Sequence, residues 1–188
     1  MAKAEFLKEK VVTVTCGTSP LGELLCEQAA QAGAKVFALD TDSTSLAQQV
    51  VRFRKNNLAL RGIPCDLTSQ LSVMQAIAQI SSHAPPIDVW IHGEVLNAAQ
   101  LERLHVAFDT FGQHFNYSNN GNVGLCLDAS TYAETAQEKI AAELTGDAKT
   151  AAVALNVIAC TTNEPVVASA QLLAKYKKDL DHGRESSN

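Results

Sequence analysis

One strand–turn–helix–strand stretch near the start of the chain restricts the fold more than any other feature. Residues 11–15, Val-Val-Thr-Val-Thr, form a β-branched run typical of a buried parallel strand. After a turn, leucines and alanines recur at helical spacing until Gly33 ends the helix. Residues 35–40 indicate a second buried strand that closes on Asp40, about 20 residues past the turn. This order predicts the opening βαβ unit of a sheet that binds a dinucleotide at its turn.

The alternation of strand and helix continues along the chain with a period of about 30 residues. Further strands are expected near 58–63, 88–92, 123–127 and 153–160, and helices near 20–32, 43–55, 69–82, 97–115, 131–150 and 165–178. Continuous apolar strands separated by helices indicate a parallel sheet covered on both faces. The prediction is a three-layer, doubly wound α/β fold of about six strands in the order 3-2-1-4-5-6. One domain over residues 1–178 and a polar tail at 179–188 are expected.

Local residues set the expected ends of two helices. Ser19 is a good N-cap, and Pro20 after it is a preferred first residue of a helix. Thr68 or Ser69 can cap the helix near 69–82. The apolar stripe of that helix is expected to be Leu71, Met74, Ile77 and Ile80.

Charge and cysteine usage argue against several classes of function for this 188-residue chain. Its net charge is −5 and its basic residues are mostly dispersed, so neither nucleic acid nor an anionic membrane is an expected partner. No apolar run approaches the roughly 20 residues of a membrane span, and no signal peptide is expected before the first strand. The five cysteines are scattered and form no local cluster with the five histidines. Reduced thiols, a cytoplasmic location and no metal site are therefore expected.

Several phrases of the sequence resemble the short-chain dehydrogenase/reductase family. Residues 15–22, Thr-Cys-Gly-Thr-Ser-Pro-Leu-Gly, are similar to the family's T-G-x-x-x-G-x-G with the last glycine in register. Residues 65–68, Cys-Asp-Leu-Thr, are similar to the C-D-V-T that follows the family's third strand. Residues 87–91 look like the strand that runs into N-N-A-G, a motif that here reads His92-Gly93-Glu94-Val95. The resemblance implies a Rossmann-type domain.

The resemblance also implies a cofactor site at the carboxyl edge of the sheet. A carboxylate at Asp40 would accept both ribose hydroxyls and repel a 2′-phosphate, which favours NAD over NADP. The family's aspartate after the third strand, here Asp66, meets the adenine amine. The implied cofactor residues are Cys16, Gly17, Ser19, Leu21, Gly22, Asp40, Asp66, Leu67, His92 and Gly93. Alternatively, Asp40 is an acid that caps the helix near 43–55, as Asp42 and Ser43 also can.

Two substitutions alter the turn that would hold the pyrophosphate. Phosphates bind there because backbone N–H groups and the helix dipole face them with no side chain between. Cys16 adds a Cβ where the family has a glycine, although Gly17 beside it can take up the unusual dihedral angles. Pro20 removes one N–H outright. Either the turn is a modified phosphate site, or it is a structural turn that has lost its ligand.

The catalytic residues of the family are also altered. The family places a serine after its fifth strand and Y-x-x-x-K on the next helix, where the lysine lowers the pKa of the tyrosine. Here Ser130 and Tyr132 are present, but the nearest lysine, Lys139, lies seven residues on, about 10 Å along a helix axis. Alternatively, Ser130 is an N-cap and Tyr132 a half-buried aromatic residue. His92 and Glu94 are either a replacement acid–base pair or part of a polar loop.

Three functions remain open from the sequence. The preferred one is a divergent, non-catalytic family member that binds NAD or a smaller adenine nucleotide. The second is an active NAD-dependent oxidoreductase acting on a small alcohol or ketone through Ser130, Tyr132 and Lys139. The third is a ligand-free interaction scaffold. In the family, helices equivalent to 97–115 and 131–150 pair between subunits, so a homodimer is expected. The apolar residues of the helix near 97–115 suit either that interface or the core. They are Leu101, Leu104, Phe108 and Phe111.

Overall fold

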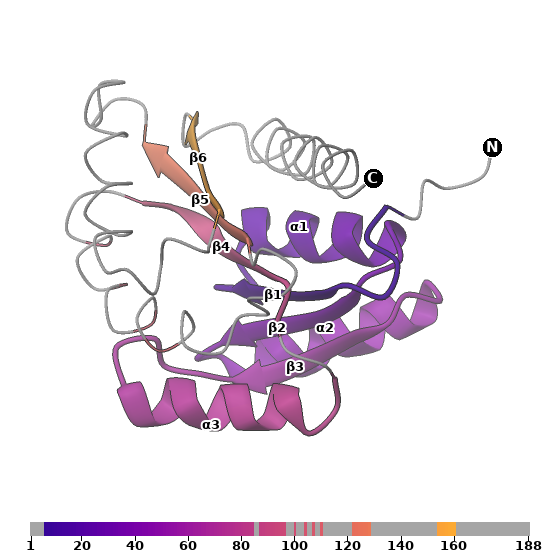
Figure 1. Ribbon diagram of the computed structural model, residues 1–188. Coiled ribbons are helices and arrows are strands. Elements are labelled where there is room, and N and C mark those ends of the chain that lie inside the picture. The colour runs from indigo at the N-terminus through magenta and orange to yellow at the C-terminus, as the bar shows by residue number, and fades with distance from the viewer. Residues whose placement is uncertain are drawn as a thin grey trace, which may run out of the picture.

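The computed structural model describes residues 6–84, 87–96, 122–128 and 154–160, with four single residues at 100, 104, 107 and 110. Six strands form one sheet with helices packed on it (Figure 1). The strands are β1 (Val11–Thr15), β2 (Lys35–Asp40), β3 (Leu60–Pro64), β4 (Val89–Leu96), β5 (Asn122–Asp128) and β6 (Ala154–Cys160). The described residues include three complete helices, α1 (Pro20–Gln31), α2 (Ser43–Lys55) and α3 (Gln70–Ser81).

All neighbouring strands pair in parallel, in the order β3-β2-β1-β4-β5-β6. The predicted fold class and strand order are therefore confirmed. The order reverses between β1 and β4, which is the switch point where folds of this type bind ligands at the carboxyl ends of the strands. Asp88 fixes the register at the other end of this pair, because its carboxylate accepts the Val11 N–H at 2.8 Å and contacts Lys10 Nζ at 3.3 Å.

The two faces of the sheet carry separate apolar cores. On one face, α1 and α2 pack against β1, β2 and β4 through residues such as Leu25, Phe53 and Ile91. On the other face, α3 packs against the sheet around the fully buried Trp90. Figure 1 shows α3 on the opposite side of the strands from α1. The predicted three-layer arrangement follows from these two cores.

The predicted stripe of α3 is half wrong. The helix buries Val73, Ala76, Ile77 and Ile80, whereas Leu71 and Met74 are 66% and 51% exposed. The buried set follows the i, i+3, i+4, i+7 pattern of one helix face. Two overlapping apolar faces exist in this helix, and packing on β1, β3 and β4 selects one of them.

The largest difference in strand bounds concerns β4. The sequence places its end near His92 and permits a polar loop after it, but the strand continues through Gly93 and Glu94 to Leu96. The loop reading is therefore wrong. The pairing of β4 with β5 changes register between Ile91 and Val95, as at a β-bulge.

Other predictions lie wholly or largely outside the described residues. These are the helices near 97–115, 131–150 and 165–178, the tail at 179–188, and the residues Ser130, Tyr132 and Lys139. Within 97–115, Leu104 is 6% exposed and packs in the α3-side core, so this residue serves the core. Among the helices that the structure describes, none combines the length and the apolar character needed to cross a membrane.

Candidate functional site

The turn between β1 and α1 is tied to β4 by one serine. Ser19 is the N-cap of α1, and its Oγ accepts the Gly22 N–H at 2.9 Å. The same hydroxyl donates a short hydrogen bond to the Gly93 carbonyl. Pro20 occupies the first helical turn, as predicted. The start of α1 is therefore anchored to the two strands at the switch point.

Cys16, not Gly17, carries the unusual backbone dihedral of the turn. Cys16 has φ 51°, in the left-handed region that non-glycine residues seldom adopt, and the expectation that Gly17 absorbs this angle is wrong. Gly17 is needed for a different reason, since a Cβ there would lie 2.8 Å from Ala38 Cβ. The buried Gln49 of α2 donates its Nε2–H to the Gly17 carbonyl at 2.8 Å, and this hydrogen bond links the turn to α2.

The carbonyl of Cys16 is enclosed by glycines of two other elements. A Cβ on Gly22 would lie 2.9 Å from Gly17 Cα and closer still to the Cys16 carbonyl oxygen. A Cβ on Gly93 would lie 2.7 Å from that same oxygen. The first turn of α1 and the strand β4 therefore meet the turn at backbone contact, which holds Cys16 against β4.

Most backbone N–H groups of the turn already have acceptors within the protein. Pro20 has none to offer. The Gly17 N–H donates to the Leu39 carbonyl, the Thr18 N–H to the Asp40 carboxylate, and the Ser19 N–H to the Cys16 carbonyl. The Gly22 N–H donates to the Ser19 hydroxyl and the Glu23 N–H to the Ser19 carbonyl. Between Gly17 and Glu23, Leu21 holds the amide that these bonds leave over. The turn therefore offers a pyrophosphate fewer backbone N–H donors than the family pattern implies.

Asp40 ends β2 beside this turn and is held by Thr18. Its Oδ2 accepts the Thr18 Oγ1–H at 2.7 Å and the Thr18 N–H at 3.2 Å. Among the described residues, its Oδ1 receives only the long 3.4 Å contact from the Asp42 N–H. The N-cap of α2 is Asp42, whose carboxylate accepts from Thr44 and Ser45. The alternative reading of Asp40 as a helix cap is therefore wrong.

Asp66 follows β3 at the same edge and is also held through one oxygen. Its Oδ1 accepts the Thr68 N–H at 2.9 Å and the Thr68 Oγ1–H at 2.7 Å, and these hydrogen bonds lower the pKa of the carboxyl group. The Asp66 side chain is exposed, and Leu67 beside it packs partly against the α3-side core. Ser69, rather than Thr68, caps α3.

His92 is a buried histidine at the end of the β1–β4 pairing. It lies opposite Thr15 in the strand register, with Nδ1 2.9 Å from Thr15 Oγ1. The same hydroxyl accepts the Trp90 Nε1–H at 3.0 Å and lies 3.5 Å from the Ile91 carbonyl. Burial lowers the pKa of His92 to about 4, against the opposing charge of Asp40, so the imidazole is neutral at pH 7.

The fold assembles a Cys–His–Glu cluster that sequence spacing did not reveal. Cys16 Sγ is 3.9 Å from His92 Nε2, and the ligand atoms of Cys16, His92 and Glu94 all lie within 4.8 Å of one another. Burial raises the pKa of the Cys16 thiol, as do the charges of Glu94 and Asp40. Cys16 lies 76 positions before His92 and 78 before Glu94, so only the β1–β4 pairing brings the three side chains together. Their one shared signal in the sequence is that they depart from the family's glycine and N-N-A-G motifs.

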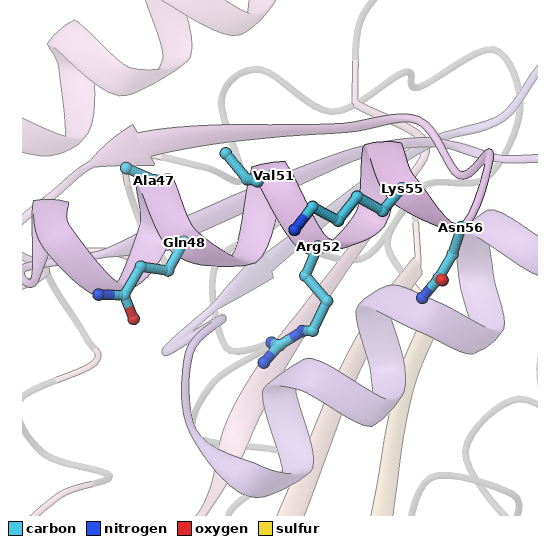
Figure 2. Close-up of a pocket in the computed structure, with 6 residues that line it drawn as sticks. All are labelled: Ala47, Gln48, Val51, Arg52, Lys55 and Asn56. Carbon is cyan, nitrogen blue, oxygen red and sulfur yellow. The ribbon is translucent and has the colours of Figure 1, made fainter.

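A separate hollow of about 550 Å³ lies along the exposed side of α2. Figure 2 shows Arg52 extending from α2 toward the neighbouring helix, where it pairs with Glu23 of α1 at 2.6 Å. The other lining residues are Ala47, Gln48, Val51, Lys55 and Asn56. None of these belongs to the turn or to the carboxyl ends of the strands, so this hollow is distinct from the predicted cofactor site.

Comparison with known proteins agrees with this fold. The sequence model of the short chain dehydrogenase family matches residues 10–139. No curated protein matches significantly. A short chain dehydrogenase from Mycobacterium smegmatis superposes with a TM-score of 0.67 at 18% identity, covering 91% of this chain and 87% of that chain. The LigO apo form from Sphingobium sp. strain SYK-6 has a TM-score of 0.65 at 16% identity, covering 95% and 74%. The RhlG/NADP active-site complex of Pseudomonas aeruginosa has a TM-score of 0.59 at 16% identity, covering 77% and 66%.

The family match spans more than half of the chain, over the strands and helices that build the site. The strand order and the βαβ opening are those of the structural relatives' fold. The chain is therefore a member of the short-chain dehydrogenase family.

Proposed function

We propose that this protein binds NAD or a smaller adenine nucleotide at the carboxyl ends of β1, β2 and β3, chiefly through the adenosine half. The observation that carries this proposal is the way in which Thr18 orients the Asp40 carboxylate through hydrogen bonds. Thr18 donates two hydrogen bonds to Oδ2, and within the described part of the chain Oδ1 has one long contact. A carboxylate oriented in this way by the turn itself is suited to accept a ribose hydroxyl.

Asp66 supports the same assignment at the adenine end. Thr68 binds Oδ1, so the second oxygen of this exposed carboxylate is available to an adenine amine. Because most N–H groups between Gly17 and Glu23 already donate within the protein, the phosphates are expected to contribute less to the binding affinity than they do in a complete glycine-rich turn. Recognition then depends on the two aspartates, and NAD is preferred to NADP because Asp40 repels a 2′-phosphate.

The catalytic part of the proposal is negative and comes from the sequence. Tyr132 and Lys139 are seven residues apart instead of four, so on the helix expected at 131–150 they would be separated by about 10 Å. At that spacing the lysine would not pair with the phenol as it does in the family's Y-x-x-x-K. We therefore assign this chain a binding role without turnover, with no substrate.

The test is a fluorescence titration that uses Trp90, the only tryptophan. Its indole N–H donates to Thr15, the residue before the turn, so a nucleotide in the site is expected to change its emission. Saturable quenching by NADH, and weaker quenching by NADPH, are the expected results. Equal affinity for the two would overturn the role of Asp40.

Two aspartates two residues apart give a matched pair of variants. Asp40→Ala is expected to weaken NADH binding at least tenfold, because it removes the ribose acceptor. Asp42→Ala removes the cap of α2 and keeps Asp40, so NADH affinity is expected to stay the same. Unchanged binding in Asp40→Ala would exclude this carboxylate. Oxidation of an alcohol that is lost in Tyr132→Phe would establish an active oxidoreductase instead.

A further inference from the structure

Three side chains at the switch point form a ligand set that a nucleotide site does not require. Cys16 follows β1, while His92 and Glu94 lie two residues apart on β4. They offer a sulfur, a nitrogen and an oxygen, all within 4.8 Å of one another. Thiolate, imidazole and carboxylate are together the ligands that Zn²⁺ takes from proteins.

The spacing of the cysteine and histidine ligand atoms is close to that of a tetrahedral metal site. Zinc binds sulfur at about 2.3 Å and imidazole nitrogen at about 2.0 Å, which places the two ligand atoms roughly 3.6 Å apart at the tetrahedral angle. Cys16 Sγ and His92 Nε2 are 3.9 Å apart. A shift of a few tenths of an ångström in a side chain is therefore enough to bring both atoms to one ion.

The hydrogen bonds around His92 orient it as a metal ligand. A hydroxyl has one proton and two lone pairs. When the Thr15 hydroxyl donates to the Ile91 carbonyl, its lone pairs accept from Trp90 Nε1 and from His92 Nδ1. We assign this tautomer because it is the one that satisfies all three contacts of the Thr15 hydroxyl at once, and it leaves the Nε2 lone pair facing Cys16. A second hydrogen bond of this kind, on the ring nitrogen away from the metal, is the usual support of a ligating histidine.

Charge and backbone conformation at the cluster agree with a cation. Cys16 lies beside the carboxylates of Glu94 and Asp40, and the cluster contains no cationic side chain of its own. Cys16 also adopts a left-handed φ of 51°, a strained conformation of the kind that collects at functional sites. All three ligands lie at positions where the sequence departs from the family's glycine and N-N-A-G motifs, as do Pro20, Gly93 and Val95.

We propose that Cys16, His92 and Glu94 bind one divalent transition-metal ion of the zinc class, with the fourth position taken by water or an outside ligand. Three protein ligands and one exchangeable position are the arrangement of zinc sites that interact with small molecules. The metal site shares Cys16 and His92 with the implied cofactor residues, but Asp40 and Asp66 are not among its ligands, so the two kinds of binding can be tested separately. Gly22 and Gly93 hold the turn against β4 and so keep the three ligands together.

The test uses untagged full-length protein, stripped with a chelator and titrated with Zn²⁺ and Co²⁺. We expect one ion per chain with sub-micromolar affinity, measured by competition with a chromophoric chelator. Co²⁺ is expected to give a thiolate-to-metal charge-transfer band and the intense visible absorption of a tetrahedral site. Absence of stoichiometric binding, or a cobalt spectrum without the thiolate band, would overturn the proposal.

Cys16→Gly is the decisive variant, because glycine suits the left-handed φ and the fold is expected to persist. It should lose the thiolate band and weaken Zn²⁺ binding at least tenfold. Glu94→Gln should also weaken Zn²⁺ binding at least tenfold but keep the thiolate band, because Cys16 remains. Thr15→Val keeps the ligands but removes the support of His92, and a loss of 10- to 100-fold is expected.

Matched controls come from outside the cluster. The exposed His83 and the buried Cys65 are not ligands, so His83→Gln and Cys65→Ala should bind Zn²⁺ like the parent protein. Asp40→Ala should also retain Zn²⁺ while losing NADH, which separates failure of this proposal from failure of the nucleotide proposal. Zn²⁺ affinity that is unchanged in Cys16→Gly would show that the ion binds elsewhere and refute the assignment.

Discussion

Replacing Gly22 with alanine sets two physical effects against each other. In a helix, alanine is more favourable than glycine by about 1 kcal/mol, so propensity alone predicts a more stable protein. In this structure the new Cβ would lie 2.9 Å from Gly17 Cα and 3.0 Å from the Cys16 carbonyl carbon. Both neighbours are backbone atoms, and the Cys16 carbonyl oxygen would be closer still, so the first turn of α1 must move by more than about 0.5 Å to reach ordinary contact distance. Overpacking against backbone costs about 3 kcal/mol, at the upper end of the usual range.

The net expectation for Gly22→Ala is a loss of about 2 kcal/mol in the free energy of unfolding, since the clash exceeds the propensity gain. For a chain of this size the melting temperature should fall by about 4–8 °C. Urea unfolding followed by Trp90 fluorescence measures the free energy, and circular dichroism measures the melting temperature. A variant as stable as the parent would refute the reasoning, because it would mean that the turn does not contact α1 as described.

Gly62→Ala is the matched control for this prediction. Its Cβ would lie 3.1 Å from Leu46 Cβ and 3.4 Å from two side-chain methyl groups, which can adjust. Alanine is also favoured over glycine within a strand by roughly 0.5–1 kcal/mol. The two effects nearly cancel, so we expect a change within about 0.5 kcal/mol. A large loss here would show that both glycines respond to a general sensitivity of the fold and not to a specific contact.

Three further predictions concern capping, protonation and packing. Ser19→Ala should cost about 1–2 kcal/mol in urea unfolding, and more than Ser69→Ala, because Ser19 both caps α1 and binds the Gly93 carbonyl. Between pH 7.5 and 5 the free energy of unfolding should fall by about 2 kcal/mol. His92 has a pKa of about 4 in the folded protein and an ordinary value of about 6.5 in the unfolded chain, so the unfolded chain takes up the proton first. His92→Asn should lose less stability over the same pH range. Ile77→Ala should cost about 2–5 kcal/mol, while Leu71→Ala should change stability by less than about 0.5 kcal/mol, and equal effects in chemical unfolding would contradict the observed face of α3.

The sequence was sufficient for features that depend on neighbouring residues or on general rules of chain topology. Ser19 and Pro20 fix the start of α1 because capping and the missing N–H act within one helical turn. The strand order follows from apolar strands that alternate with helices, since right-handed crossovers leave few arrangements. These parts of the fold were predicted correctly from local pattern.

Features that depend on distant contacts were not predictable in this way. The segment His92-Gly93-Glu94 has the composition of a turn, but Gly93 fits against the Cys16 carbonyl and the strand continues. The apolar residues of α3 permit two faces, and only the sheet selects one. Gln49 was not singled out as a contact of the turn, because a glutamine on an amphipathic helix normally faces solvent. The Cys16–His92–Glu94 cluster exists only after β1 and β4 have paired.

The pairing of β1 with two strands of different sequence distance has a consequence for synthesis on the ribosome. Val12 pairs with Val36 of β2, 24 residues later, and with Val89 of β4, 77 residues later. At about 5–20 residues per second, the second partner emerges roughly 4–15 s after β1. During that interval β1, although central in the finished sheet, is an edge strand with open hydrogen-bonding groups and a β-branched surface. A nascent chain that stalls before residue 89 is therefore expected to aggregate and to recruit chaperones more readily than the finished sheet.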